Sequence, residues 1–496
     1  MDIMMEALSN VFQPGVIVIL LAGIFLGISI GVLPGLTSTM GVALLLPITF
    51  GMGQITGILL LIGVYFGSVY GGSITAILLN TPGTPASAAT AMDGYALSKR
   101  GFAHKALTTS TISAATGGFL SVLVLILVAP QIAGFALRFS APEYFALAFF
   151  GISIISSLAA KSLVKGLITG MAGLLIATIG MDPMGGFPRF TFETQELTSG
   201  INFIPVMIGL FAASEAFTSM EDVFSKRKVQ ILVEKIKLKW VEFKSIILII
   251  LQSSGIGTFI GMIPGAGADI AAFVAYNEAQ RFSKKKDEFG KGALAGVAAP
   301  EAAGNSVTGG AMIPLLTLGI PGDAVTAVLL GALMVQGIQP GPMLFESNGP
   351  LVYTLFVGML IANIFILIFG LLGVRLFTKI LLVPKSILTP IILILSVIGS
   401  YALGNNYFDV LVMLVAGIAG YFMKKYGFPV SPLILGLILG PMMESNLRRS
   451  LVMSQGDISI LFTRPIACIL VILAIITLFT PIIKGVIQNR KKSVKS

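Results

Sequence analysis

Long uncharged stretches constrain the fold of this chain more than any other feature. Residues 16–30, 351–372 and 466–483 carry no charged side chain, and each is close to the length of about 20 residues that an α-helix needs to cross the hydrocarbon core of a bilayer. Only 11% of all residues are charged, whereas soluble domains carry about 25%. The sequence therefore predicts an all-α polytopic membrane protein.

The basic residues mark one side of the bilayer. Cytoplasmic loops are enriched in Lys and Arg, and all but five of the 32 basic residues fall into seven clusters at 99–105, 161–165, 226–244, 281–291, 375–385, 424–425 and 484–495. The five others are Arg138, Arg189, Arg448, Arg449 and Arg464. This pattern predicts about 12 membrane segments, with the N-terminus outside and the C-terminus in the cytoplasm. Because topology explains the net charge of +10, no nucleic-acid partner is expected.

Two Pro-Gly breaks inside membrane segments align when the chain is compared with itself. Residues 27–35 (GISIGVLPG) match residues 257–265 (GTFIGMIPG), and residues 73–75 and 80–84 match residues 306–308 and 319–323 after a six-residue gap. The first pair of segments has flanks without positive charge, whereas the second has basic flanks. We therefore expect two inverted-topology repeats with interrupted or re-entrant helices. The predicted boundaries are 1–225 for the first repeat, 226–244 for a basic cytoplasmic linker, 245–486 for the second repeat and 487–496 for a basic cytoplasmic tail.

The chain contains four such Pro-Gly breaks, and we expect them to form a substrate site near the midplane. Backbone at membrane depth is tolerated only where it is buried in protein or lines a wet cavity, and the N-terminus of a half-helix attracts anions. The expected hinge residues are Pro34, Gly35, Pro82, Gly83, Pro264, Gly265 and Pro321. The expected substrate-binding residues are Thr37, Ser38, Thr39, Ser73, Thr75, Asn80, Thr81, Thr84, Asn305, Ser306, Thr308 and Gly322.

Three acidic residues are expected within the membrane, where ionisable groups are costly and usually functional. Asp269, Glu301 and Asp323 are candidates for a coupling-ion site that binds Na⁺ or H⁺, and the sequence does not choose between the two ions. Asp269 and Asp323 also suit the N-cap of the helix that follows each break. No cofactor is expected, and no metal other than Na⁺, because Cys468 is the single cysteine and lies in an apolar run.

Several long motifs closely resemble the large permease subunit of the tripartite tricarboxylate transporter family. They are residues 31–36 (GVLPGL), 63–101, 261–273 (GMIPGAGADIAAF) and 298–342, in the right order. The resemblance implies secondary uptake of citrate or other carboxylates across the cell membrane of a prokaryote. It also implies two partners, a small four-helix membrane subunit and a soluble extracytoplasmic solute-binding protein.

Two other functions are weaker alternatives. Residues 265–269 (GAGAD) faintly resemble the Gly-x-Gly-Asp signature of intramembrane aspartyl proteases, but the spacing differs by one residue and no partner motif is present. His104, the single histidine, lies in a basic loop, which excludes a Ser-His nucleophile pair. A channel would not require paired interrupted helices in inverted halves. The sequence therefore predicts a transporter and no enzyme.

Overall fold

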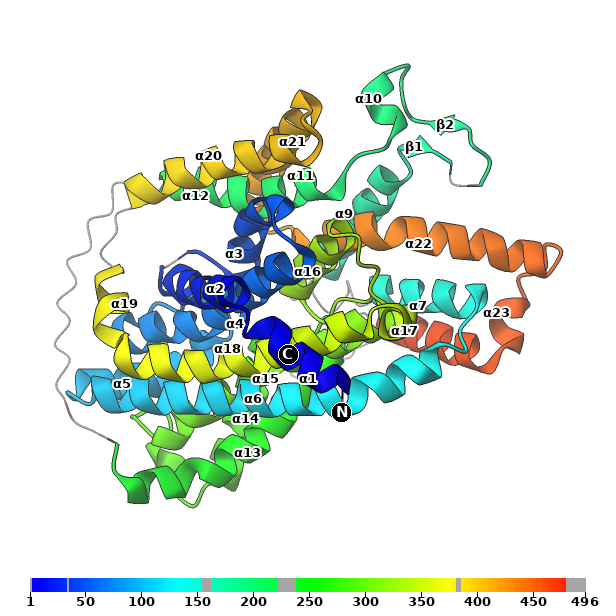
Figure 1. The fold of residues 1–496 in the computed structure, drawn as a ribbon. Coiled ribbons are helices and arrows are strands. Elements are labelled where there is room, and N and C mark those ends of the chain that lie inside the picture. Colours follow the sequence, from blue (N-terminus) through cyan, green and yellow to red (C-terminus); the bar gives the residue numbers. More distant parts are fainter. Residues whose placement is uncertain are drawn as a thin grey trace, which may run out of the picture. The chain divides into compact units, whose positions relative to one another are not determined.

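The computed structural model describes residues 2–33, 35–153, 162–182, 184–221, 238–380 and 385–478. It consists almost wholly of helices (Figure 1). The chain divides into two compact units, one formed by Met1–Phe135 and Glu215–Leu403 and the other by Ala136–Ser214 and Gly404–Ser496. Each unit thus contains parts of both halves of the chain. The predicted repeat boundaries remain a prediction, and positions 226–237 of the linker and the whole tail lie outside the described residues.

The first unit holds all four Pro-Gly breaks. Its helices are α1 (Asp2–Val11), α2 (Pro14–Val32), α3 (Ser38–Leu45), η1 (Leu46–Gly51), α4 (Gln54–Leu79), α5 (Ser87–Lys99), most of α6 (Ala103–Ala136), α12 (Ser214–Glu221), α13 (Trp240–Met262), α14 (Gly267–Phe282), η3 (Lys286–Glu288), α15 (Leu294–Leu318), α16 (Ala324–Val335), α17 (Pro342–Ser347), α18 (Gly349–Leu372), α19 (Val374–Ile380) and α20 (Lys385–Gly404). The breaks separate α2 from α3, α4 from α5, α13 from α14 and α15 from α16.

The described residues contain eight helices that are long and apolar enough to cross a membrane, together with four shorter apolar helices. This confirms the predicted all-α polytopic membrane protein. α15 is 25 residues long but is not among the eight, because Glu301, Asn305 and many small residues lower its hydropathy. Protein surrounds this helix, and nearly all of its residues are buried. A polar helix is tolerated at membrane depth in such surroundings.

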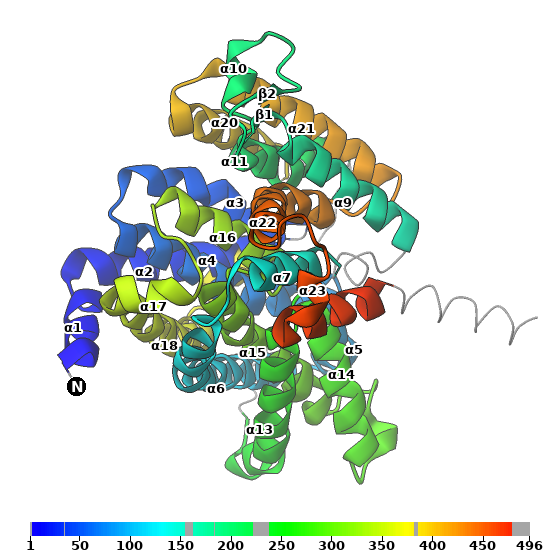
Figure 2. The same cartoon turned by 90° about the vertical axis from the view of Figure 1, so that its right-hand side faces the viewer.

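The second unit contains the other helices and a short β-hairpin. Its elements are α7 (Ala141–Ser153), α9 (Leu163–Ala177), β1 (Gly180–Met181), β2 (Pro188–Arg189), α10 (Gln195–Thr198), α11 (Phe203–Met207), the π-helix η2 (Ile208–Ala213), α21 (Tyr407–Lys425), α22 (Ser431–Met453) and α23 (Ile460–Thr463). The two strands pair antiparallel, with Gly180 opposite Arg189. α22 packs against both α7 and α9 (Figure 2).

An ion-pair network joins this hairpin to α22. Arg189 donates two hydrogen bonds to Glu444, at 2.6 and 3.1 Å, and Arg448 contacts Asp182 and Glu444 at 2.8 Å each. The N–H groups of Gly185 and Met184, and then Arg448, lower the pKa of Asp182 from 3.8 to about 2. Two of the five arginines outside the basic clusters, Arg189 and Arg448, therefore hold this unit together through ion pairs. In the same unit Arg464 pairs with Glu143 at 3.2 Å.

Candidate functional site

In the first half of the chain, the two Pro-Gly breaks touch each other. Gly83 follows α4, and its backbone N–H donates to the carbonyl of Gly72 at 3.2 Å. A Cβ atom on Gly83 would lie only 2.2 Å from the carbonyl oxygen of Gly31, near the end of α2. Only glycine fits this position, since the opposing atom belongs to backbone. Pro34, the first expected hinge, lies outside the described residues, and Gly35 beside it has a φ of +95°.

The second half has an equivalent close contact between its breaks, although its hydrogen bond joins different positions. The N–H of Gly265, between α13 and α14, donates to the carbonyl of Gly322 at 2.6 Å. A Cβ atom on Gly322 would lie 2.9 Å from the carbonyl oxygen of Gly261 and 2.7 Å from the Cβ of Ala311. Pro82, Pro264 and Pro321 all lie in the non-helical segments between helices. Each half therefore joins its own two breaks through a close backbone contact.

These contacts define which residues of the two halves are equivalent. Gly72 and Gly83 stand eleven residues apart, as do Ala311 and Gly322, and both pairs adjoin the glycine that precedes the first break of their half. Our expected pairing of residues 73–75 with 306–308 is therefore wrong by six residues. That pairing aligned residues of similar type. The packing of α4 on α2 and of α15 on α13 determines which residues of α4 and α15 are equivalent.

Contacts one to two helical turns before these residues support the same equivalence between the halves. A Cβ on Gly27 of α2 would lie 2.5 Å from the carbonyl oxygen of Val64, and one on Gly257 of α13 would lie 2.2 Å from that of Ala303. Val64 and Ala303 precede Gly72 and Ala311 by the same eight residues. The two helix pairs thus approach in the same way, as small residues at a helix interface allow.

The four breaks are also connected between the halves. Gly304 of α15 lies between the second and third breaks, because its Cβ position is 3.5 Å from the Cβ of Ala86 and 3.9 Å from the carbonyl oxygen of Ala268. Tyr65 of α4 donates to Asp323, at the fourth break, at 2.8 Å. α16, which begins after the fourth break, packs on α3, which begins after the first (Figure 1). The four breaks are therefore linked within the first unit, directly or through α4, α15 and the contact of α16 with α3, and we call this connected set of breaks the ring.

Three hydroxyl groups at the first two breaks are buried and have no hydrogen-bond partner among the described residues. They belong to Ser38, at the start of α3, and to Thr81 and Thr84, between α4 and α5. An unsatisfied buried polar group costs about 1–3 kcal/mol, so such groups are rare unless a ligand or water completes them. All three were expected to contact substrate, and the ring provides donors that a ligand can use.

Other expected substrate residues bond to their own helix. The side chains of Thr75, Ser306 and Thr308 donate to backbone carbonyls three or four residues earlier, and Asn305 donates to the carbonyl of Glu301 at 3.0 Å. The amide oxygen of Asn305 and the acceptor sites of these hydroxyls stay available to a ligand.

The remaining expected substrate residues lie at helix ends. Thr37 is the N-cap of α3 and accepts a hydrogen bond from the N–H of Met40, and Thr39 is buried in that helix. Asn80 is exposed and ends α4 in the left-handed conformation, with φ 55°. Asn80 is therefore a helix C-cap, a position at which Asn is favoured after Gly.

Glu301 is held at the centre of a hydroxyl cluster. Its side chain is 2% exposed, and its carboxylate accepts from Ser73 of α4 and Thr90 of α5 at 2.5 Å each and from Ser110 of α6 at 2.9 Å. Within the described ranges no Lys or Arg pairs with it. The sequence identified Glu301 and Ser73 but missed Thr90 of α5 and Ser110 of α6, which lie outside the Pro-Gly motifs and their matched segments.

The other two acidic candidates differ from Glu301. Asp323 is the N-cap of α16, where its carboxylate accepts from the N–H of Thr326 at 2.8 Å in a reciprocal capping box. Asp269 is exposed and lies in the first turn of α14, whose N-cap is Ala266. The N-cap alternative is thus confirmed for Asp323 and wrong for Asp269, which lies three residues too far along the chain.

Two acidic residues near the breaks were not anticipated. A Cβ on Gly35 would lie 3.5 Å from a carboxylate oxygen of Glu215, on α12. Asp93 of α5 is fully buried and accepts from the N–H groups of Gly292 and Ala293 at 2.7 and 2.8 Å. Asp93 therefore caps the start of α15 from another helix. Neither contact leaves a sequence signal, since the partners are about 180 to 200 residues apart and local patterns such as capping motifs span only a few residues.

Comparison with known proteins assigns the chain to a family. The sequence profile of the tripartite tricarboxylate transporter TctA family matches residues 17–435. The chain belongs to this family. As a TctA-family protein it is the membrane permease subunit of a tripartite transporter, and transport rather than enzymatic chemistry is the activity of the family.

Two curated relatives of this TctA-family protein come from Agrobacterium vitis. An uncharacterized 52.8 kDa protein in the TAR-I ttuC' 3' region is 39% identical over 499 residues, which cover 99% of both chains. An uncharacterized protein in the TAR-II ttuC' 3' region is 39% identical over 234 residues, 47% of this chain and 97% of the relative. No solved structure matches the chain.

Proposed function

We propose that this permease imports small organic anions, tri- or dicarboxylates such as citrate, by ion-coupled alternating access in the cell membrane of a prokaryote. The observation that carries the proposal is the ring of four broken helices in the first unit, at which the hydroxyls of Ser38, Thr81 and Thr84 are buried and have no partner in the part of the chain that the structure describes. Broken helices from two related halves are the usual substrate site of secondary transporters.

The ring suits a carboxylate although no Arg or Lys lies among its break residues. α3, α5, α14 and α16 all begin at the breaks, and each helix start carries partial positive charge and several N–H groups without a partner in the helix. Thr37 and Asp323 already cap one of these groups at α3 and at α16. α5 and α14 offer the most open starts, because their N-caps, Ala86 and Ala266, have no side chain that can accept a hydrogen bond. Substrate carboxylates would bind at these helix starts, with the three hydroxyls as further donors.

Glu301 is the proposed coupling site. A buried carboxylate without a cationic partner is costly, and either H⁺ or Na⁺ would compensate its charge. Protonation would leave the hydrogen bonds to Ser73, Thr90 and Ser110 in place. Na⁺ would require these hydroxyls to turn their oxygens toward the ion. Of the other two acidic candidates, Asp269 remains proposed for contact with the ion or the substrate, and Asp323 for support of α16.

The proposal includes two partners and an orientation. A soluble extracytoplasmic binding protein would deliver the substrate, and a small membrane subunit would accompany the permease. The N-terminus would face outward and the C-terminal tail inward, as the clusters of basic residues indicate.

Uptake into proteoliposomes tests this function. The permease, its small subunit and its binding protein are reconstituted, and labelled citrate and a set of dicarboxylates are offered with an imposed H⁺ gradient, an imposed Na⁺ gradient or neither. We expect accumulation above the outside concentration with one of the two gradients. Downhill flux that ignores both gradients would identify a channel instead.

Glu301→Gln tests the coupling site in the same assay. The amide keeps the size of the side chain but cannot carry a charge or a proton, so we expect uptake that no longer responds to either gradient. Glu346→Gln, an exposed glutamate of α17, is the matched control and should transport normally. Gradient-driven uptake by Glu301→Gln at the wild-type rate would exclude Glu301 as the coupling site.

A further inference from the structure

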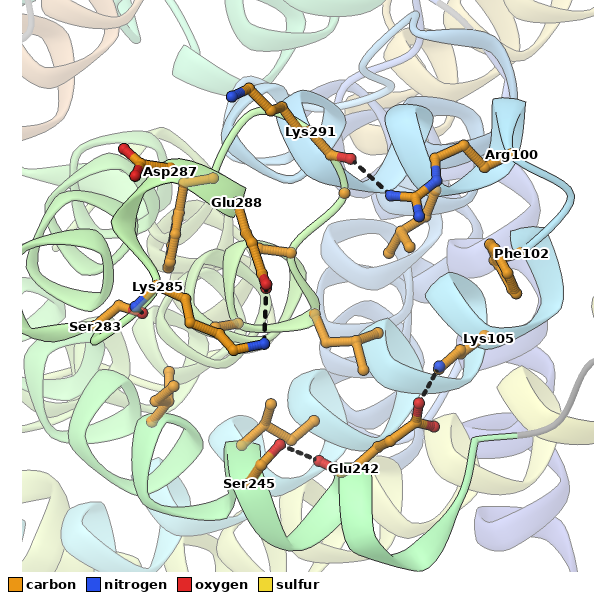
Figure 3. A pocket seen from close by; sticks show the side chains of 18 residues that line it. Arg100, Phe102, Lys105, Glu242, Ser245, Ser283, Lys285, Asp287, Glu288 and Lys291 are labelled. Carbon is orange, nitrogen blue, oxygen red and sulfur yellow. Dashed lines mark hydrogen bonds and ion pairs between the residues drawn. The ribbon is translucent and has the colours of Figure 1, made fainter.

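A cavity of about 750 Å³ lies in the first unit, away from the ring. It is enclosed by the C-terminal end of α5, the starts of α6, α13 and α15 and the loop that follows α14 (Figure 3). Its floor is apolar and includes Ile246, Ile249 and Leu294, whereas Arg100, Lys105 and Lys285 lie around it. These segments contain or adjoin the basic clusters at 99–105, 226–244 and 281–291, which we expect on the cytoplasmic side.

Four of the seven charged side chains that line the cavity are paired with one another, whereas Arg100, Asp287 and Lys291 form no ion pair among the described residues. Lys105 pairs with Glu242, and Lys285 pairs with Glu288 at 2.9 Å. The guanidinium of Arg100 donates one hydrogen bond, at 3.1 Å, to the backbone carbonyl of Lys291 (Figure 3). In the described part of the chain it has no carboxylate partner. Its remaining N–H donors form a fork that matches a phosphate.

The start of α13 places the cavity at the level of lipid head groups. Trp240, the first residue of the helix, is 67% exposed, and the ammonium of Lys244 lies 5.8 Å from the centroid of its ring. Tryptophan of this kind marks the membrane–water interface. Ser245 of the cavity is one turn further along, and the exposed side chains of Leu248 and Leu251 continue toward the hydrocarbon.

We propose that this cavity binds the head group of an anionic phospholipid. Arg100 holds the phosphate, the ammonium groups of Lys105 and Lys285 add positive potential, and the acyl chains lie along the exposed apolar face of α13. Basic pockets between membrane helices on the cytoplasmic side are suited to such head groups. The apolar floor favours a lipid over a free anion, because a small hydrophilic ion gains nothing from Ile246 and Ile249.

Lipid binding to the purified full-length chain tests the proposal. Native mass spectrometry counts bound lipid, and the melting temperature is measured in neutral detergent with phosphatidylglycerol, phosphatidylcholine, inorganic phosphate or citrate added. We expect phosphatidylglycerol alone to bind and to raise the melting temperature. Arg100→Gln should weaken its binding about fivefold, the factor that corresponds to the loss of one cation near an anionic lipid, and Arg100→Lys should weaken it less.

Lys284→Gln is the matched control. Lys284 is the neighbour of Lys285 in the basic loop after α14, but it does not line the cavity. Its affinity for phosphatidylglycerol should equal that of the wild type. Equal binding of phosphatidylcholine, or full affinity in Arg100→Gln, would overturn the proposal. Competition by inorganic phosphate or citrate at the same concentration as the lipid would also overturn it, since the site would then serve free anions.

Discussion

At Gly83, the close packing of the ring leaves no room for a side chain. A side chain here would meet the carbonyl oxygen of Gly31 at 2.2 Å and the Cα of Gly72 at 2.8 Å, and neither backbone atom can move without separating α2 from α4. We expect Gly83→Ala to lower the free energy of unfolding by about 1–3 kcal/mol, the usual cost of overpacking. Thermal unfolding in detergent measures this loss.

Gly15→Ala is the control for this change. Gly15 lies in α2, and a Cβ atom there would meet nothing within 4 Å, so we expect no loss of stability. If Gly83→Ala unfolds at the same temperature as Gly15→Ala, the two first-half breaks are not in the close contact described here.

At the same scale, the sequence predicted a site residue when its chemistry was unusual for its surroundings. Glu301 was identified because a carboxylate is rare in a membrane segment. Thr90 and Ser110 were missed, because Thr and Ser are common in membrane helices and only the packing of α5 and α6 on α15 brings them to Glu301. Asp93 was missed because the N–H groups that it accepts from, those of Gly292 and Ala293, lie about 200 residues further along the chain.

Among the elements, α16 and α14 begin in different ways. α16 begins with Asp323 in a reciprocal capping box, whereas α14 begins at Ala266 without a side-chain cap. Aspartate and asparagine are equally good N-caps, and their replacement by alanine costs about 1 kcal/mol. The charge of Asp323 and its capping role can therefore be separated by two substitutions.

We expect Asp323→Ala to lower the free energy of unfolding by about 1 kcal/mol and Asp323→Asn to leave it nearly unchanged. Because Glu301 is the proposed coupling site, Asp323→Asn should also keep gradient-driven uptake. Thermal unfolding and proteoliposome uptake of the two variants provide the measurements. Loss of coupling in a stable Asp323→Asn variant would instead assign part of the coupling to Asp323.

The elements also show where sequence comparison between the halves was limited. The Pro-Gly motifs located all four breaks correctly, because Pro and Gly have strong local effects on a helix. Between the breaks, α4 and α15 consist largely of small and apolar residues that resemble one another in many registers. The similar residues at 73–75 and 306–308 were therefore misleading, and the close contacts of Gly72 and Ala311 showed which residues are equivalent.

At the scale of the whole molecule, each half contributes helices that pack on the other half. α5 follows a first-half break and packs on α14 and α15 through a cluster of alanines that includes Ala86, Ala271 and Ala303. α16 follows a second-half break and packs on α3 and α4. The sequence predicted two related halves but not the packing of helices from one half on helices of the other. That packing depends on contacts between residues about 180 to 290 positions apart, which local sequence patterns do not reveal.

A disulfide between the halves tests whether α5 packs on α15. The Cβ of Ala86 lies 3.5 Å from the Cβ position of Gly304, within the range of about 3.5–4.5 Å that a disulfide requires. In a Cys468→Ser background, we expect Ala86→Cys with Gly304→Cys to form a disulfide on mild oxidation, detected by mass spectrometry of the linked peptides. Ala86→Cys with Gly255→Cys should remain reduced, because nothing lies within 4 Å of a Cβ on Gly255.

The central claim is that the ring of four breaks binds the transported anion, and substrate protection tests it most directly. Thr84→Cys and Ala268→Cys are made separately in the Cys468→Ser background, and each is modified with a small thiol reagent with and without the carboxylate that the uptake assay identifies. We predict that saturating substrate slows modification at both positions and leaves a cysteine at Gly15 unaffected. Unchanged rates at both positions in variants that still bind the substrate would contradict the account.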